Sequence, residues 1–477
     1  MAMITHVEID GFKMFRDFQV DLEPLQVIVG PNAAGKSNFF DALLLLSHLA
    51  DADLRTAFQQ LRGDAGELFT VQPDGTRGSR MKFAVELLVD PTIADSWGAV
   101  VDLKYTRLRY ELAIVRQTDS KGLERLYVDQ EALSLIQRGT DRWLRRHHLA
   151  QHPRLLPKLT GGRAPFISTE QEHGVPTVYL HQDGRSGRKG SVAARMERTV
   201  LSGVANTEFP HAFAVRAALR NWRFLQLNPE VLRKPSSMVD AQVLGADGSH
   251  LPGMLARLEA SDPFLLNDIA RDLSNLVPGI VQVEVEADRV RDEYVIWAHT
   301  QDGRRFSSRV LSDGTLRMLA LVALKHDPEH SGVLLFEEPE NGVHPFRLKN
   351  IAAVISQLAT DFSDPESAAE PLRQFLCNTH SPVFISQPDI LPHVLFAFTA
   401  QRVDAASTGR VGQRITRMAP VRGSVVQPAL ELGIAEEEQS YTLEEVKAFL
   451  ESADLGEART LLQAGGNGSR RRNGLSA

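Results

Sequence analysis

The chain has 477 residues, a net charge of −7 and a single cysteine, Cys377. This length supports a large core and more than one lobe, and the mild acidity argues against a protein that coats nucleic acid, although it leaves room for a local basic groove. One cysteine excludes an internal disulfide, and neither a signal peptide nor an apolar run of membrane-spanning length is present, so we expect a cytoplasmic protein without membrane contact.

The first part of the chain, 3–29, predicts two or three strands separated by Gly11 and Pro24. The last of them, 25–29, is short, apolar and rich in β-branched residues. We expect these strands to form one sheet that the next motif closes.

Residues 30–37 match the pattern G-x-x-x-x-G-K-[ST] of a phosphate-binding loop, and a buried helix is predicted directly after them. Gly30 and Gly35 allow the backbone to turn its N–H groups toward phosphates at the helix N-terminus. Lys36 is expected to reach the β- and γ-phosphates of ATP, and the Ser37 hydroxyl to ligate Mg²⁺. The alternative is an ordinary glycine-rich turn. The predicted nucleotide-binding residues are Gly30, Pro31, Asn32, Ala33, Ala34, Gly35, Lys36, Ser37 and Asn38.

The region 51–220 is harder to interpret. Segments 81–89 and 100–116 alternate as strands and suggest an antiparallel extension beside the nucleotide. The basic stretch 145–148 contains two histidines, and His152 follows, but no cysteine or acidic residue lies at metal-ligand spacing. A solvated basic loop is therefore favoured over a metal site there, and a surface loop is expected over 183–190.

Regular structure returns after residue 220. A strand over 221–229 is stopped by proline, one or two helices are predicted over 251–276, and 280–309 reads as a β-meander around a turn at 302–303. The meander leads into Leu-Ser-Asp-Gly-Thr at 311–315, just ahead of an apolar helix. Taken alone, Ser312 is most simply an N-cap.

Two carboxylates and a histidine follow further along the chain. A buried strand over 333–336 ends in Glu337 and Glu338, and a strand beginning near 373 ends at His380. Beside a phosphate-binding loop, one carboxylate can hold Mg²⁺ and the other can polarise the attacking water. Successive parallel strands could bring these residues and Ser312 to one sheet edge, although an isolated histidine after a strand is usually structural.

Taken as an ordered set, these motifs resemble the ABC-type ATPases of the SMC and RecF-like group, in particular the stand-alone AAA family ATPases related to the ATPase half of OLD-type nucleases. The resemblance covers roughly 1–50 and 220–395 and rests on GPNAAGKS (Walker A), LSDGT (signature), VLLFEEPENGVHP (Walker B and D-loop) and NTHSP (switch histidine). It implies an α/β fold: a P-loop NTPase head of the ABC type with a mixed central sheet, an antiparallel β extension and a partly helical insert.

The resemblance also assigns roles. Glu337 takes the Mg²⁺-binding position, Glu338 the catalytic position, and His380 contacts the γ-phosphate. Ser312 and Gly314 of the signature bind the γ-phosphate held by a second subunit, so ATP joins two heads in a homodimer. Asn341 and His344 fall in the D-loop. The signature departs from the family pattern LSGGQ, and a Q-loop glutamine is not identified, although 201–203 lies near where one is expected.

The implied organisation is an ATPase lobe over 1–230 that includes the insert 51–220, a signature and Walker B lobe over 231–400, and an extension over 401–477 with a flexible basic tail. No long heptad run and no nuclease-like acidic pattern after His380 is present in the sequence. The sequence therefore predicts an ATP-hydrolysing switch that regulates a separate effector, such as a nuclease or toxin in anti-phage defence. The alternative is a RecF-like DNA-repair ATPase that binds duplex DNA; a transporter subunit is less consistent with the long insert.

Overall fold

The computed structural model describes residues 2–72, 74–119, 121–149, 152, 155–156, 164–172, 175–182, 188–192, 196–364, 367, 370–402, 413–422 and 440–451. Two predicted features, most of the loop 183–190 and the basic tail at 469–472, lie outside these residues. None of the described helices is long and apolar enough to cross a membrane.

A six-stranded sheet forms the centre of the molecule. Its strands, in spatial order, are β12 (Arg223–Leu225), β17 (Gly332–Glu337), β18 (Arg373–Thr379), β3 (Leu25–Val29), β19 (Val394–Arg402) and β20 (Gln413–Pro420). The first five are parallel and β20 pairs antiparallel with β19, so the sheet is mixed, as predicted. All five residues of β3 are buried, which is the pattern of a strand covered on both faces.

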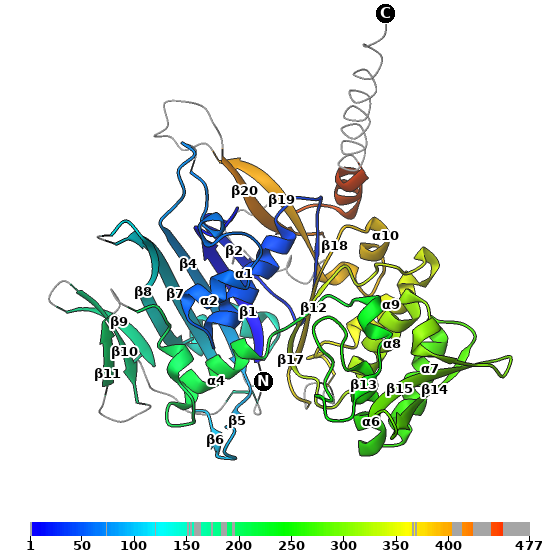
Figure 1. The fold of residues 1–477 in the computed structure, drawn as a ribbon. Coiled ribbons are helices and arrows are strands. Elements are labelled where there is room, and N and C mark those ends of the chain that lie inside the picture. The colour runs from blue at the N-terminus through cyan, green and yellow to red at the C-terminus, as the bar shows by residue number, and fades with distance from the viewer. Residues whose placement is uncertain are drawn as a thin grey trace, which may run out of the picture.

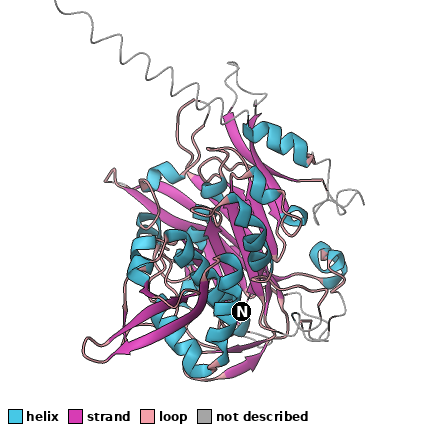
Figure 2. Cartoon of the chain, turned by 90° about the vertical axis from the view of Figure 1, so that its right-hand side faces the viewer, coloured by secondary structure: helices cyan, strands magenta, loops and turns pink. Residues whose placement is uncertain are grey.

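The two faces of this sheet bury different side chains. Ile28 packs into a core shared with helix α1 (Lys36–Leu49), whereas Val27 and Val29 pack into a second core on the other face. Four helices build that second core: α6 (Leu251–Ser261), α7 (Phe264–Leu276), α8 (Asp313–His326) and α9 (Leu348–Ser356). Cys377 is buried on this face. The two layers lie on opposite sides of the central strands (Figure 1), and Figure 2 shows the molecule from the helical side.

A second, eight-stranded antiparallel sheet packs against α1. Its order is β11 (Arg188–Val192), β10 (Val175–His181), β9 (Ile167–Glu172), β8 (Glu124–Leu135), β7 (Arg107–Thr118), β4 (Arg80–Val89), β1 (Ala2–Asp10) and β2 (Phe18–Asp21). The three N-terminal strands are confirmed, but the expectation that they share one sheet is wrong. β1 and β2 pair here, while β3 pairs only with β18 and β19 because its mostly apolar, fully buried sequence suits a sheet covered on both faces.

Smaller elements complete the fold. They are α2 (Leu54–Gln59), α3 (Arg142–Arg146), α4 (Pro210–Arg220), α5 (Pro229–Leu232), α10 (Pro382–Ile385), β5 (Thr92–Ala94), β6 (Val100–Asp102), β13 (Ser236–Ser237), β14 (Ile280–Asp288), β15 (Glu293–Thr300), β16 (Arg305–Ser307) and a helix over 443–451. The predicted meander corresponds to β14–β16, and the predicted helical stretch 251–276 is the pair α6 and α7. The described residues of 51–220 form mainly strands, together with the α-helices α2, α3 and α4.

The basic stretch 145–148 corrects another expectation. Arg146 Nη1 lies 2.9 Å from Glu23 Oε1, and His147 Nε2 lies 2.6 Å from Glu23 Oε2, while the Glu23 side chain is only 1% exposed. A solvated basic loop is therefore wrong for these two residues, because they pair with a carboxylate that would otherwise be buried without a counter-charge.

Candidate nucleotide site

The predicted catalytic residues meet at the carboxyl edge of the parallel sheet. β18 lies between β17 and β3, and in this register Glu337 pairs with Asn378 while Thr379 pairs with Val29. The residues that follow these strands, Glu338, His380 and the phosphate-binding loop at 30–35, therefore share one edge. This is where ligands of open α/β sheets bind.

The loop 30–35 needs glycine for steric reasons. A Cβ on Gly30 would lie 2.3 Å from the Ala397 carbonyl oxygen, and a Cβ on Gly35 would lie 2.2 Å from Thr416 Oγ1. Gly35 also adopts φ +96°, a left-handed conformation that other residues rarely adopt. Strands β19 and β20 thus lie directly against the loop. Only glycine, which has no Cβ, allows the loop backbone to approach them so closely.

The N-terminus of α1 suits an anion. Its cap, Gly35, provides no side-chain hydrogen bond, and the first turn contains no acidic residue. The N–H groups of a first helical turn have no acceptors within the helix, and the helix dipole adds positive potential there. The described residues therefore fit a phosphate group at this position.

Lys36 lies over the same loop. Its Nζ donates hydrogen bonds to the carbonyl oxygens of Gly30 and, at 2.9 Å, Pro31. Burial lowers the pKa of Lys36, while the nearby charges of Glu338, Glu340 and Glu337 act in the opposite direction. The lysine therefore lies within the electrostatic field of the Walker B carboxylates, as a phosphate-binding lysine facing a metal site should.

Glu338 has an unusual backbone conformation. Its φ is +49°, in the left-handed region where a non-glycine residue is strained. The Glu338 N–H donates to the Asn378 carbonyl at 3.0 Å, which holds this turn against β18. On its side chain, Oε1 lies 3.1 Å from His380 Nδ1, and Oε2 accepts a hydrogen bond from Asn341 Nδ2 at 3.1 Å. The two predicted catalytic residues are thus in direct contact.

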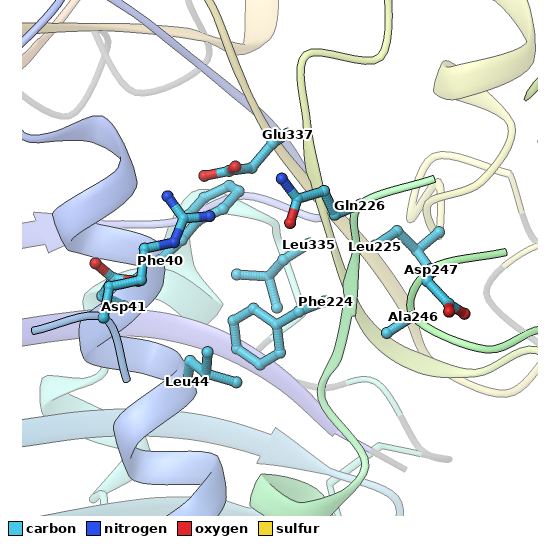
Figure 3. A pocket seen from close by; sticks show the side chains of 11 residues that line it. Phe40, Asp41, Leu44, Phe224, Leu225, Gln226, Ala246, Asp247, Leu335 and Glu337 are labelled. Atoms are coloured by element: carbon cyan, nitrogen blue, oxygen red, sulfur yellow. The ribbon is translucent and has the colours of Figure 1, made fainter. Parts of the chain in front are cut away.

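Glu337 has a different environment. Asn378 Nδ2 donates to its Oε1 at 3.3 Å, and its side chain lines a cleft of about 320 Å³ between α1 and β12. Gln226 lines the same cleft, and in Figure 3 the Gln226 amide and the Glu337 carboxylate both point toward the α1 side. A carboxylate oxygen and an amide oxygen that line one cleft are donors that Mg²⁺ prefers. The described residues therefore fit a magnesium ion as well.

Gln226 is the residue that sequence reasoning missed. β12 is parallel to β17 with Leu225 opposite Phe336, so the next residues, Gln226 and Glu337, are neighbours at the sheet edge. The segment Leu201–Gly203, where a Q-loop was expected, instead forms a short 3-10 helix, and the Leu201 N–H donates to Glu131 in the antiparallel sheet. In the sequence, the available signal for this role was a glutamine directly after a short run of strand-forming residues.

Arg62 is a second residue without a sequence motif. It lines the cleft with Gln226 and Glu337, and also a second cleft of about 580 Å³ that includes Asn38. Its side chain therefore lies between the two clefts that flank the start of α1. An arginine at this place can add positive charge beside bound phosphates.

Ser312 and Gly314 lie outside this group of residues. Ser312 caps α8, where its Oγ accepts a hydrogen bond from the Thr315 N–H at 3.2 Å, as the simplest sequence reading predicted. A Cβ on Gly314 would lie 2.8 Å from the Gly342 carbonyl, so the start of α8 packs tightly on the D-loop. The start of α8 therefore lies beside the residues that follow β17 at the carboxyl edge, while α8 itself packs on the face of the sheet opposite α1.

Two protein-family models match the chain. The model described as "AAA ATPase domain" matches residues 3–90, and the model described as "AAA domain, putative AbiEii toxin, Type IV TA system" matches residues 205–386. The first segment contains the phosphate-binding loop, and the second contains the signature, Glu337, Glu338 and His380. A search of curated proteins found no match.

Solved structures of SMC heads are also similar. An SmcHead bound to the C-winged helix domain of ScpA is 12% identical with a TM-score of 0.47, covering 87% of this chain and 97% of that chain. An Smc head with an extended coiled coil, bound to the C-terminal domain of ScpA derived from Pyrococcus furiosus, is 11% identical with a TM-score of 0.46, covering 91% and 99%. The SMC head from Thermotoga maritima is 11% identical with a TM-score of 0.36, covering 88% and 99%.

These identities and TM-scores are low, so the assignment rests on the family models and on the site itself. Both matched models are ATPase domains, and together they contain all four motifs. The phosphate-binding loop, Glu337 and Glu338 lie at one edge of a mixed sheet. The family models and the geometry of the site support an AAA ATPase of the ABC type.

Proposed function

We propose that this chain is an ATP-hydrolysing switch whose two copies join through bound ATP and whose joined state regulates a separate effector. The proposal rests on the observation that the predicted site residues lie on two separate parts of the chain's surface. Lys36, Glu337, Glu338 and His380 meet at one sheet edge, whereas Ser312, the residue expected to complete the site, begins a helix on the other face.

For hydrolysis, Lys36 and the N–H groups of α1 would hold the phosphates. Ser37, Glu337 and Gln226 would hold Mg²⁺, which neutralises charge developing on the transferred phosphoryl group. Glu338 would accept the proton of the attacking water, since general bases must lie within hydrogen-bond reach of the reacting group. His380, which contacts Glu338, would orient that carboxylate and donate to the γ-phosphate.

For pairing, Ser312 would act on the nucleotide of the other copy. The residue is exposed, and the start of α8 is packed on the D-loop at Gly342. A second copy related by a two-fold axis could present this surface to the phosphates and receive the same contact in return. ATP would then hold two heads together until it is hydrolysed.

The effector proposal draws on the family model for 205–386, whose description refers to a toxin and a type IV toxin–antitoxin system. A nuclease or toxin regulated by the ATP-bound dimer is consistent with that description. The second candidate, a DNA-repair ATPase that clamps duplex DNA, rests on the resemblance of the motifs to RecF-like proteins and predicts DNA binding without any protein partner.

The test combines three measurements on the full chain. Magnesium-dependent phosphate release reports hydrolysis, and sedimentation with a non-hydrolysable ATP analogue or with ADP reports pairing. Fluorescence anisotropy with duplex DNA over a salt series reports DNA binding, which falls steeply with salt when phosphates are contacted. We expect hydrolysis and analogue-dependent pairing; absence of both contradicts the proposal, and tight analogue-dependent duplex binding favours the repair candidate.

A further inference from the structure

The most exposed large aromatic side chain among the described residues lies next to the catalytic face. Phe346 is 92% exposed, and its ring stacks on His344 with centroids 5.2 Å apart and an interplanar angle of 21°. The turn is ordered by hydrogen bonds from the Phe346 and Arg347 N–H groups to His344, at 3.5 and 2.8 Å. A fixed, exposed aromatic ring is the usual anchor of a protein interface.

A cleft of about 350 Å³ lies beside the same turn. Its walls are Glu338, Glu340, Asn341, Gly342, Val343, Pro345, Leu348, His380, Ser381, Pro382 and Val383. No residue of the phosphate-binding loop lines it, so the cleft extends beyond the loop that would hold the nucleotide. Glu338 and His380 form one wall, whereas Leu348, Pro382 and the half-exposed Val383 form an apolar rim.

The packing of the signature identifies what would fill this cleft. Gly314 lies against Gly342, and Arg317 Nη1 donates to the Asn341 carbonyl at 3.0 Å, so the start of α8 and the D-loop form one rigid surface. A second copy that brings its Ser312 to the nucleotide must also bring its D-loop and Phe346 to the catalytic edge.

From this geometry we propose that Phe346 of each copy inserts into the cleft beside Glu338 of the other copy. The proposal rests on the proposed ATP-dependent pairing and names the contact that anchors it. A two-fold axis requires that the projecting group and its receptor lie on the same surface, as Phe346 and the cleft do. The inserted ring would cover the open side of the Glu338–His380 pair and exclude bulk water from it.

The first experiment measures pairing of the full chain with a non-hydrolysable ATP analogue by analytical ultracentrifugation. Phe346→Ala should raise the dimer dissociation constant at least about 100-fold, because two buried anchors are lost. Phe264→Ala, which removes another exposed phenylalanine (73%) at the start of α7, is the matched control and should pair like the wild type. Calorimetry should give unchanged nucleotide affinity for both variants, which shows that they are folded.

The second experiment locates the ring. The native Cys377 is buried, so an introduced cysteine is the reactive thiol among the described residues. A mixture of Phe346→Cys and Val383→Cys proteins should form a bismaleimide cross-link between the two variants only with the analogue. Val100→Cys, on β6 and 65% exposed, replaces Val383→Cys in the control and should not cross-link.

The outcomes separate this inference from the proposed function. If the wild type does not pair with the analogue, the proposed function fails and the insertion fails with it. If the wild type pairs and Phe346→Ala pairs equally well, only the insertion is overturned. Cross-linking of Phe346→Cys to itself rather than to Val383→Cys also overturns it, because the two rings would then meet at the axis.

Discussion

Two helices of this molecule begin at a sequence motif, α1 at the phosphate-binding loop and α8 at the signature. Their N-termini differ in whether a side chain of the same chain already caps the helix. The first turn of α1 has a glycine cap without a side-chain hydrogen bond and no acidic residue. The first turn of α8 has Ser312 bonded to the Thr315 N–H and contains Asp313, which pairs with Arg233. The α1 terminus thus has room for a phosphate within its own chain, whereas the α8 terminus is already capped by its own side chain and is exposed.

The largest effect is expected when the phosphate-binding N-terminus of α1 is altered. Lys36→Ala removes the ammonium that lies over the loop, and ATP affinity should fall at least about 100-fold because a charge-assisted contact to phosphate is lost. Calorimetry measures the affinity. Lys349→Ala, on the exposed face of α9, is the control and should bind ATP normally. Undiminished affinity of Lys36→Ala contradicts the assignment of the loop.

The second effect separates the two carboxylates. Glu338→Gln should still bind ATP but hydrolyse it about 100-fold more slowly or worse, since the water-activating group is lost while Glu337 remains for the metal. Glu337→Gln should instead weaken the magnesium dependence of binding. Phosphate release and calorimetry distinguish these results. Normal turnover by Glu338→Gln together with slow turnover by Glu337→Gln shows that the roles are reversed.

A smaller effect is expected at His380. His380→Ala should lower kcat about 10- to 100-fold with little change in nucleotide affinity, because a contact that strengthens in the transition state appears in kcat. The side chain is half exposed, so thermal stability should change little. If the variant instead loses stability and keeps its activity per folded molecule, His380 is a structural residue.

The smallest effect is expected at the N-terminus of α8, where Arg233 pairs with Asp313. Arg233→Ala leaves Asp313 unpaired at an exposed helix N-terminus, where its charge would repel the phosphates of a second copy. Analogue-dependent pairing should weaken about 5-fold, which is the size of a charge effect at a helix end. The double variant Arg233→Ala/Asp313→Asn should restore pairing. Failure of the double variant to restore it indicates that Arg233 acts through its second contact, the Leu311 carbonyl.

The sequence was sufficient to predict a feature wherever all the residues that determine that feature lie in one short segment. The phosphate-binding loop is flanked directly by its strand and its helix, and Glu337 ends an apolar strand, so both were predicted with their correct neighbours. The cap role of Ser312 was also local, because its hydrogen-bond partner lies three residues away.

Features that depend on distant pairing could not be predicted in this way. Gln226 reaches the site only because a three-residue strand pairs with β17, more than one hundred residues later. The side chains of Arg146 and His147 are largely covered because both contact Glu23, which lies more than one hundred residues earlier in the chain. β1 and β3 were both predicted as strands, but their assignment to different sheets depends on pairing with strands far along the chain.

The central claim is that Ser312 acts on the nucleotide of another copy, and one measurement tests it most directly. Light scattering of the Glu338→Gln protein with ATP, with and without Ser312→Arg, reports pairing when hydrolysis is slow. We expect ATP-dependent association in the first protein and none in the second, because arginine is too bulky for the space between a helix N-terminus and a phosphate. Both proteins should bind ATP with similar affinity. Equal association of the two proteins would contradict the account and leave Ser312 as a helix cap only.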